Sequence, residues 1–227
     1  MNELPPFAHD PRLGERTFAF GWGARPATAD DVAAHLTETV ERLAEIEPAW
    51  AEVRFLFEMR ALRASDPGPV LTLGDDLARR IDRRGRFEAP AAPRPVGPWG
   101  YSFVLDNQRK EDDPLYVALF IGAGATAEEK GNQVYFKLPA QHPMWRDVEQ
   151  GLRVLRLGAA VWRADCAQVS ALVPEGQYLP RPWLNWTRHG APPLPVLSGK
   201  YLTYPAEYEA FPHETREAFG GLLKVWP

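Results

Sequence analysis

The sequence has few of the residues that mark disulfide-bonded, metal-binding and membrane-spanning proteins. Its 227 residues include a single cysteine, Cys166, which excludes an internal disulfide and any thiolate cage built within one chain. No run approaches the ~18 apolar residues that cross a bilayer, and residues 1–10 lack the basic start and apolar stretch of a signal peptide. We therefore expect a cytoplasmic protein without a membrane span.

Charge and composition further restrict the class of protein to which the chain can belong. The chain carries 26 basic and 30 acidic residues, a net charge of −4, so a surface that neutralises many phosphates is not expected and nucleic acid is an unlikely partner. With 45% hydrophobic and 25% charged residues the chain has the composition of a globular protein. Its length suits one domain spanning 1–227, with the proline-rich stretch 89–98 as an internal connection.

Hydrophobic periodicity predicts strand, helix and strand in the first part of the chain. Residues 16–22 are aromatic and are followed by Gly23, as in a short strand. Thr28 begins a capping-box pattern, after which apolar residues recur every three or four positions as far as Leu43. Residues 50–57 alternate as a half-buried strand does, and 75–81 read as a brief helix.

The second half begins with three strands and a long helix. The segments 101–105, 115–121 and 133–138 are joined by connections too short for a covering helix, which predicts an antiparallel meander. Pro143 opens a helix that runs to Trp162, and 166–173 follows it as an apolar strand. Two later strands are predicted at 200–204 and 221–226. These elements predict an α+β fold, with a mostly antiparallel sheet and two main helices in a single domain.

Reactive side chains do not form a recognisable catalytic motif. The five histidines are isolated from one another, and glycine-rich phosphate loops and serine-nucleophile motifs are absent. Cys166 opens an apolar strand, as a small buried hydrophobe does. We predict that the chain is not an enzyme, with no catalytic residue, no metal site and no cofactor. The alternative is a small hydrolase that uses Cys166 or a site assembled from Asp113, His142 and His189.

Three groups of residues are candidates for binding. Glu111, Asp112 and Asp113 lie in a turn between strands, where they can bind a basic partner or a divalent cation, or simply be solvated. Aromatic rings in the loop-rich tail either close the core or form an exposed anchor; they include Tyr178, Trp183 and Trp186. Five arginines in residues 79–86 fit a charged helix end, and an RNA-binding module is the alternative.

A family resemblance rests on four segments. They are residues 42–55 with Pro48-Ala49-Trp50, the helix end and strand 162–173, the strand 200–204, and the ending 220–226. In this order they resemble the immunity protein 52 family of bacterial polymorphic-toxin systems. The resemblance implies an α+β protein without chemistry of its own. Such a protein binds a cognate toxin, often of a restriction-endonuclease-like class delivered between bacteria, for example by type VI secretion, and blocks it.

The residues themselves agree with a role in binding. A mildly acidic domain with an acidic turn and spare aromatic rings suits an inhibitor of a basic nuclease, because opposite charge speeds association and aromatic anchors slow release. We therefore predict an immunity protein that neutralises a cognate toxin by stoichiometric binding, and leave its oligomeric state open. The predicted contact residues are Glu111, Asp112, Asp113, Tyr178, Trp183 and Trp186.

Overall fold

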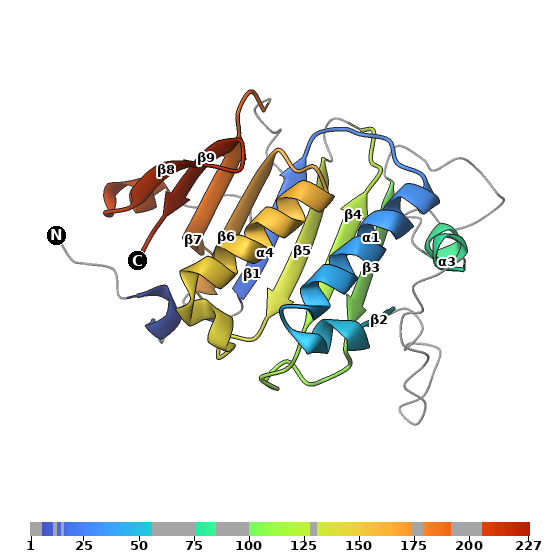
Figure 1. The fold of residues 1–227 in the computed structure, drawn as a ribbon, viewed down its shortest axis with the longest axis horizontal. Coiled ribbons are helices and arrows are strands. Elements are labelled where there is room, and N and C mark those ends of the chain that lie inside the picture. Colours follow the sequence, from blue (N-terminus) through green and yellow to red (C-terminus); the bar gives the residue numbers. More distant parts are fainter. Residues whose placement is uncertain are drawn as a thin grey trace.

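The computed structural model describes most of the chain. The described residues are 6–10, 13–14, 16–55, 76–84, 100–127, 131–173, 179–191 and 206–227. Within them, three α-helices and a nine-stranded antiparallel sheet form a single α+β domain (Figure 1), which confirms the predicted fold class. None of the described helices combines the length and the apolar character needed to cross a membrane.

The sheet forms one layer, with the strand order β2-β3-β4-β5-β1-β6-β7-β9-β8 and antiparallel pairing throughout. Strand β1 lies in the middle, between β5 and β6. On one side of it β2 to β5 form a meander, and on the other side β6 and β7 are followed by β9, with β8 at the edge. The strands are β1 Arg16–Trp22, β2 Arg54–Phe55, β3 Tyr101–Asp106, β4 Ala118–Ala123, β5 Asn132–Leu138, β6 Cys166–Val173, β7 Leu179–Arg188, β8 Glu214–Ala218 and β9 Gly221–Val225.

Helices α1 (Ala29–Ala44) and α4 (Val148–Val161) lie side by side across one face of the sheet, and α3 (Leu77–Arg84) packs against α1 beyond the β3 side (Figure 1). The predicted capping box of α1 is present: the Thr28 hydroxyl accepts from the Asp31 amide, and the Asp31 carboxylate accepts from the Thr28 amide. These hydrogen bonds lower the pKa of Asp31. Four 3₁₀ turns complete the described elements: η1 Phe7–His9, η2 Pro48–Glu52, η3 Pro143–Arg146 and η4 Ala206–Ala210.

The core lies between the helices and the central strands. Phe18 and Phe20 of β1 are fully buried, and Phe20 meets α4 at Gly158, where a Cβ atom would lie 2.3 Å from its ring. Gly151 likewise faces the ring of Trp183 at 2.7 Å. The two glycines that weaken the predicted helix are therefore the points at which α4 approaches the sheet most closely.

Several predicted boundaries are wrong for local reasons. Residues 48–52 form η2 instead of a strand, because Pro48 suits a first helical turn and the Glu47 carboxylate accepts from the Ala49 amide. Strand β4 begins at Ala118, after a turn in which the Tyr116 amide donates to the carbonyl of Asp113. The long helix begins at Val148, after the short turn η3. The predicted strand 200–204 and the proline-rich stretch 89–98 lie outside the described residues.

Candidate binding surface at the acidic end of the sheet

The predicted acidic residues Glu111, Asp112 and Asp113 lie in the connection between β3 and β4, at one end of the sheet. Contacts from two other segments hold this connection in place. Arg109 bonds Glu52 of η2 at 3.2 Å and lies 3.6 Å from Asp113. The side-chain amide of Gln141, after β5, donates to the carbonyl of Asp112 at 2.8 Å. Three segments far apart in sequence are thus drawn together.

The connection is also ordered internally. The side chain of Asn107 donates to the carbonyl of Leu115 at 2.7 Å and accepts from the amide of Val117 at 3.2 Å. The Asp113 carboxylate accepts from the Leu115 amide at 2.8 Å, a local turn that favours this residue type. The acidic residues therefore sit on a fixed loop, and a partner would not have to order it.

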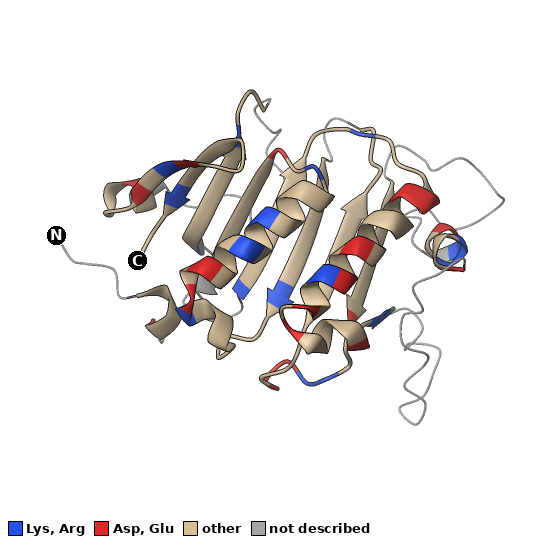
Figure 2. Cartoon of the chain, viewed as in Figure 1, with Lys and Arg blue, Asp and Glu red and all other residues tan. Residues whose placement is uncertain are grey.

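Helix α1 and η2 bring further carboxylates to the same end. Glu41, Glu45 and Glu52 are exposed there, and Figure 2 shows acidic residues gathered around the end of α1, η2 and the β3–β4 connection. We call this surface the acidic end; it comprises Glu41, Glu45, Glu52, Glu111, Asp112 and Asp113. Three cations offset part of this charge: Arg109 pairs with Glu52 and Asp113, Lys137 contacts Glu111 at 3.3 Å, and Lys110 is exposed in the same turn. The Glu111 side chain nevertheless remains 75% exposed. The surface presents negative charge to an approaching partner.

The predicted aromatic contacts are not exposed. Trp183 and Trp186 of β7 are each 3% exposed. Trp183 stacks on Phe7 with ring centroids 5.2 Å apart, and the indole nitrogen of Trp186 donates to the carbonyl of Ala218 at 2.9 Å. Both rings belong to the core because β7 is an inner strand, and neither offers surface to a partner. Tyr178 lies outside the described residues.

The side chains of the alternative enzyme site are held apart by separate partners. His142 is buried beside Glu47, at the end of α1, with 3.1 Å between its Nε2 atom and the carboxylate. His189 is exposed and contacts Glu217 of the edge strand β8. Across the described ranges, no group of three His, Cys, Asp or Glu side chains is placed to hold a metal ion.

Cys166 is half-buried, and its surroundings make it a poor nucleophile. Desolvation and then the neighbouring Asp165 charge raise the pKa of its thiol from 9.0 to about 12. The raised pKa also makes the free energy of unfolding depend on pH. The thiol ionises at a lower pH in the unfolded chain than in the folded protein, so its contribution to stability is fully present below pH 9 and is lost as the pH rises toward 12.

Alkylation measures this directly. At pH 8 we expect iodoacetamide to modify Cys166 in the folded protein about a thousandfold more slowly than in the urea-unfolded chain, since the thiolate is the reactive form. The unfolded chain serves as the internal control because it carries the same single thiol. A folded-state rate within tenfold of the unfolded rate would show an accessible, activated thiol instead.

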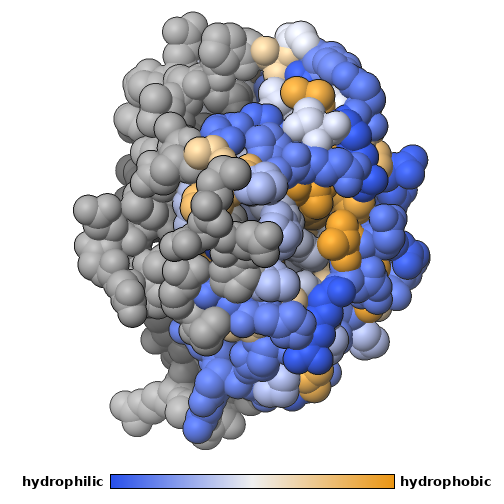
Figure 3. All heavy atoms as spheres, turned by 90° about the vertical axis from the view of Figure 1, so that its left-hand side faces the viewer, coloured by the Kyte–Doolittle hydropathy of each residue, from blue (hydrophilic) through white to orange (hydrophobic). Residues whose placement is uncertain are grey.

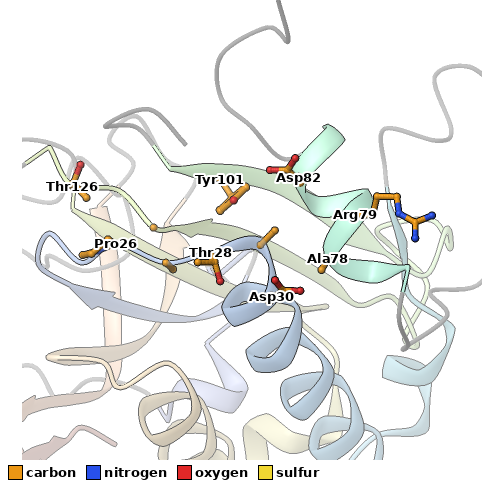
Figure 4. A pocket seen from close by; sticks show the side chains of 11 residues that line it. Pro26, Thr28, Asp30, Ala78, Arg79, Asp82, Tyr101 and Thr126 are labelled. Atoms are coloured by element: carbon orange, nitrogen blue, oxygen red, sulfur yellow. The ribbon is translucent and has the colours of Figure 1, made fainter. Parts of the chain in front are cut away.

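A hollow of about 570 Å³ lies between the start of α1, α3 and β3 (Figure 4). Its polar side chains do not converge on a common point. The Thr28 hydroxyl donates to Asp31 within the capping box, and Arg79 points away from the other labelled side chains and pairs with Asp76 at 3.0 Å. Arg80 of the arginine cluster 79–86 is likewise engaged locally, because its guanidinium lies over the Phe55 ring.

Sequence reasoning identified the acidic turn but not its neighbours. The apolar period of the first helix predicts that Glu41 and Glu45 lie on its polar face, yet nothing in the sequence says that this face ends beside the turn. The available signal is that Glu41 and Glu45 stand four residues apart, on one face of the helix, and that Glu52 follows seven residues later. No protein-family model matches the chain, and no curated protein matches its sequence. The resemblance to the immunity protein 52 family therefore stays a prediction.

Proposed function

We propose that this protein is an immunity protein that binds a basic toxin effector, of a nuclease type, through the acidic end and neutralises it by forming a stoichiometric complex. The observation that carries the proposal is the gathering of exposed carboxylates from α1, η2 and the β3–β4 connection on one fixed surface. The surface with which a nuclease binds its substrate is basic because it neutralises phosphates.

The geometry supports binding by electrostatic complementarity. The carboxylates stand on a helix end and on a hydrogen-bonded loop, so little conformational entropy is lost when a partner docks. Opposite charges on two such surfaces increase the rate of encounter and suppress partners of the wrong charge. Binding in this way needs no reactive side chain and no cofactor.

Co-expression with the toxin encoded beside this gene tests the proposal. We expect wild-type protein to restore growth of cells that produce the toxin. The triple variant Glu45→Lys, Glu111→Lys, Asp112→Lys should bind the toxin at least about tenfold more weakly and lose protection, because three exposed attractions become repulsions.

A second triple variant provides the matched control. Glu149→Lys, Glu214→Lys and Glu217→Lys change three exposed carboxylates at the other end of the sheet by the same total charge, and should leave protection intact. Failure of the wild-type protein to protect would contradict the immunity function. Full protection by the acidic-end variant would show that the contact surface lies elsewhere.

A further inference from the structure

The outward face of α4 carries a stripe of arginines. Exposed residues recur along this face at steps of four, three and four; they are Glu149, Arg153, Arg156 and Ala160. The stripe ends with the exposed Arg163, which lies two residues beyond the helix and has a φ angle of 48°. Within the described part of the chain, no carboxylate pairs with the three arginines of this stripe. Figure 2 shows basic residues on α4 and acidic residues on α1, so the two helices present opposite charges to solvent.

Beside this stripe runs a groove. The sheet continues through β9 and β8 beyond the strands that α4 covers. Two adjoining hollows of about 620 and 730 Å³ therefore lie between α4 and the β8–β9 hairpin. Both hollows are lined by Arg156 and Phe219. Leu152 and Leu223 line one hollow, and Ala159 and Ala160 line the other. Figure 3, which faces this end of the molecule, shows apolar atoms within a hollow framed by hydrophilic residues.

Further arginines are held in fixed positions around the groove. Arg25 donates to the carbonyl of Arg163, at the end of α4, at 3.1 Å. Arg188 donates through Nε to the buried carboxylate of Asp165 at 3.1 Å, and its side chain is 47% exposed. These contacts place two more cations at one hollow without movement on binding.

The tip of the hairpin adds an unusual residue. Phe219 and Gly220 have φ angles of 53° and 73°, the left-handed pair of a tight hairpin turn that favours Asn-Gly. A bulky residue at such a position costs on the order of 1 kcal/mol or more. Burial in the core does not offset this cost, because the Phe219 side chain is 39% exposed. Its ring lies 5.6 Å from the Arg156 guanidinium, at the boundary of the two hollows. A strained, exposed ring over a cationic groove indicates a contact residue.

The geometry points to a second binding surface: the groove between α4 and the β8–β9 hairpin takes an acidic, amphipathic segment of a partner protein. The arginines pair with its carboxylates, and its apolar side chains pack against the exposed Phe219 ring, since Leu152 and Leu223 beneath the groove are already buried. The α4 stripe is about 20 Å long, which matches roughly four turns of a partner helix. This surface is opposite in charge to the acidic end and does not depend on the function proposed for it.

The lining of the groove favours protein over nucleic acid. Single-stranded nucleic acid binds through rows of exposed aromatic rings; of the two aromatic side chains that line the described groove, Phe219 is exposed and Trp186 is 3% exposed. The exposed Phe219 ring offers no hydrogen bond to a phosphate, whereas it can bury apolar side chains of an amphipathic helix.

Fluorescence anisotropy tests this surface with a designed peptide. The probe is a fluorescein-labelled helix of about 16 residues with leucine on one face and glutamate on the other, measured at about 0.05 M salt. We expect the full-length protein to bind it. The variant Arg153→Glu, Arg156→Glu, Arg163→Glu should bind at least about tenfold more weakly, and Phe219→Ala severalfold more weakly.

Three comparisons decide between the outcomes. Arg42→Glu, Arg79→Glu and Arg146→Glu change three exposed arginines outside the groove by the same charge, and should leave peptide binding within about twofold. The acidic-end variant should also retain it, which separates this proposal from the immunity function. Absence of binding by the folded wild-type protein, equal loss in both arginine variants, or tighter binding of a labelled oligothymidine than of the peptide would overturn the proposal.

Discussion

Replacing Asp10 with asparagine is expected to lower the free energy of unfolding by about 3 to 5 kcal/mol. The Asp10 carboxylate is fully buried and lies 2.5 Å from the guanidinium of Arg181, whose side chain is 1% exposed. Arg16 is also buried, and its Nε and Nη1 atoms have no hydrogen-bond partner. Burial and then the Arg181 charge lower the pKa of Arg16 to about 10, while Asp10 acts in the opposite direction. Without Asp10, two buried cations lose this counter-charge.

Urea unfolding measures the effect, and two variants control for it. Asp112→Asn makes the same chemical change at an exposed site and should alter stability by less than about 0.5 kcal/mol. Arg16→Met should be close to neutral or stabilising, because it replaces a cation without hydrogen bonds at Nε and Nη1 by an apolar side chain against Phe7 and Trp145. If Arg16→Met costs as much as Asp10→Asn, the account of this cluster is wrong.

Replacing Gly158 with alanine is expected to lower the free energy of unfolding by about 1 to 3 kcal/mol. Helix propensity alone predicts the opposite, a more stable protein. Alanine is ~1 kcal/mol better than glycine within a helix. At this position, however, the new methyl group would lie 2.3 to 2.7 Å from three atoms of the Phe20 ring. The ring cannot move away easily, because it packs against Phe136 with centroids 4.8 Å apart.

The opposite change on the exposed face of the same helix is the control. Ala160→Gly should cost about 1 kcal/mol from propensity alone. Both variants should therefore destabilise, although they exchange the same residues in opposite directions. The double variant Phe20→Leu with Gly158→Ala should recover part of the loss. Thermal unfolding of the wild type, the single variants Phe20→Leu and Gly158→Ala, and the double variant gives the coupling. A stabilised Gly158→Ala protein would show that α4 does not approach β1 this closely.

Elements with a strong apolar period could be predicted from the sequence. Strands β1 and β6 have the predicted bounds, and α1 begins at its predicted cap, since each combines a clear period with a local start or stop signal. Strand β7 was missed because Pro180 and Pro182 read as loop residues; its pairing with β6 shifts register near Pro182. Strand β8 was missed because it is exposed and charged, with no apolar alternation.

The binding surfaces depend on contacts that the sequence does not encode locally. The acidic turn is visible as three consecutive acidic residues, but its meeting with Glu52 depends on Arg109, which bonds across the chain. Trp183 and Trp186 looked like interface rings because β7 was taken for a loop. The arginine stripe of α4 is periodic in sequence, yet the groove beside it exists only because β8 and β9 extend the sheet past the helix.

The most direct test of the proposed function is the rate at which the purified protein associates with the toxin encoded beside its gene, measured by stopped-flow fluorescence at increasing salt. We expect a one-to-one complex whose association rate falls steeply with ionic strength, and a slower, nearly salt-independent rate for Glu45→Lys, Glu111→Lys, Asp112→Lys. An association rate that is the same at low and high salt, or no complex at all, would contradict recognition through the acidic end.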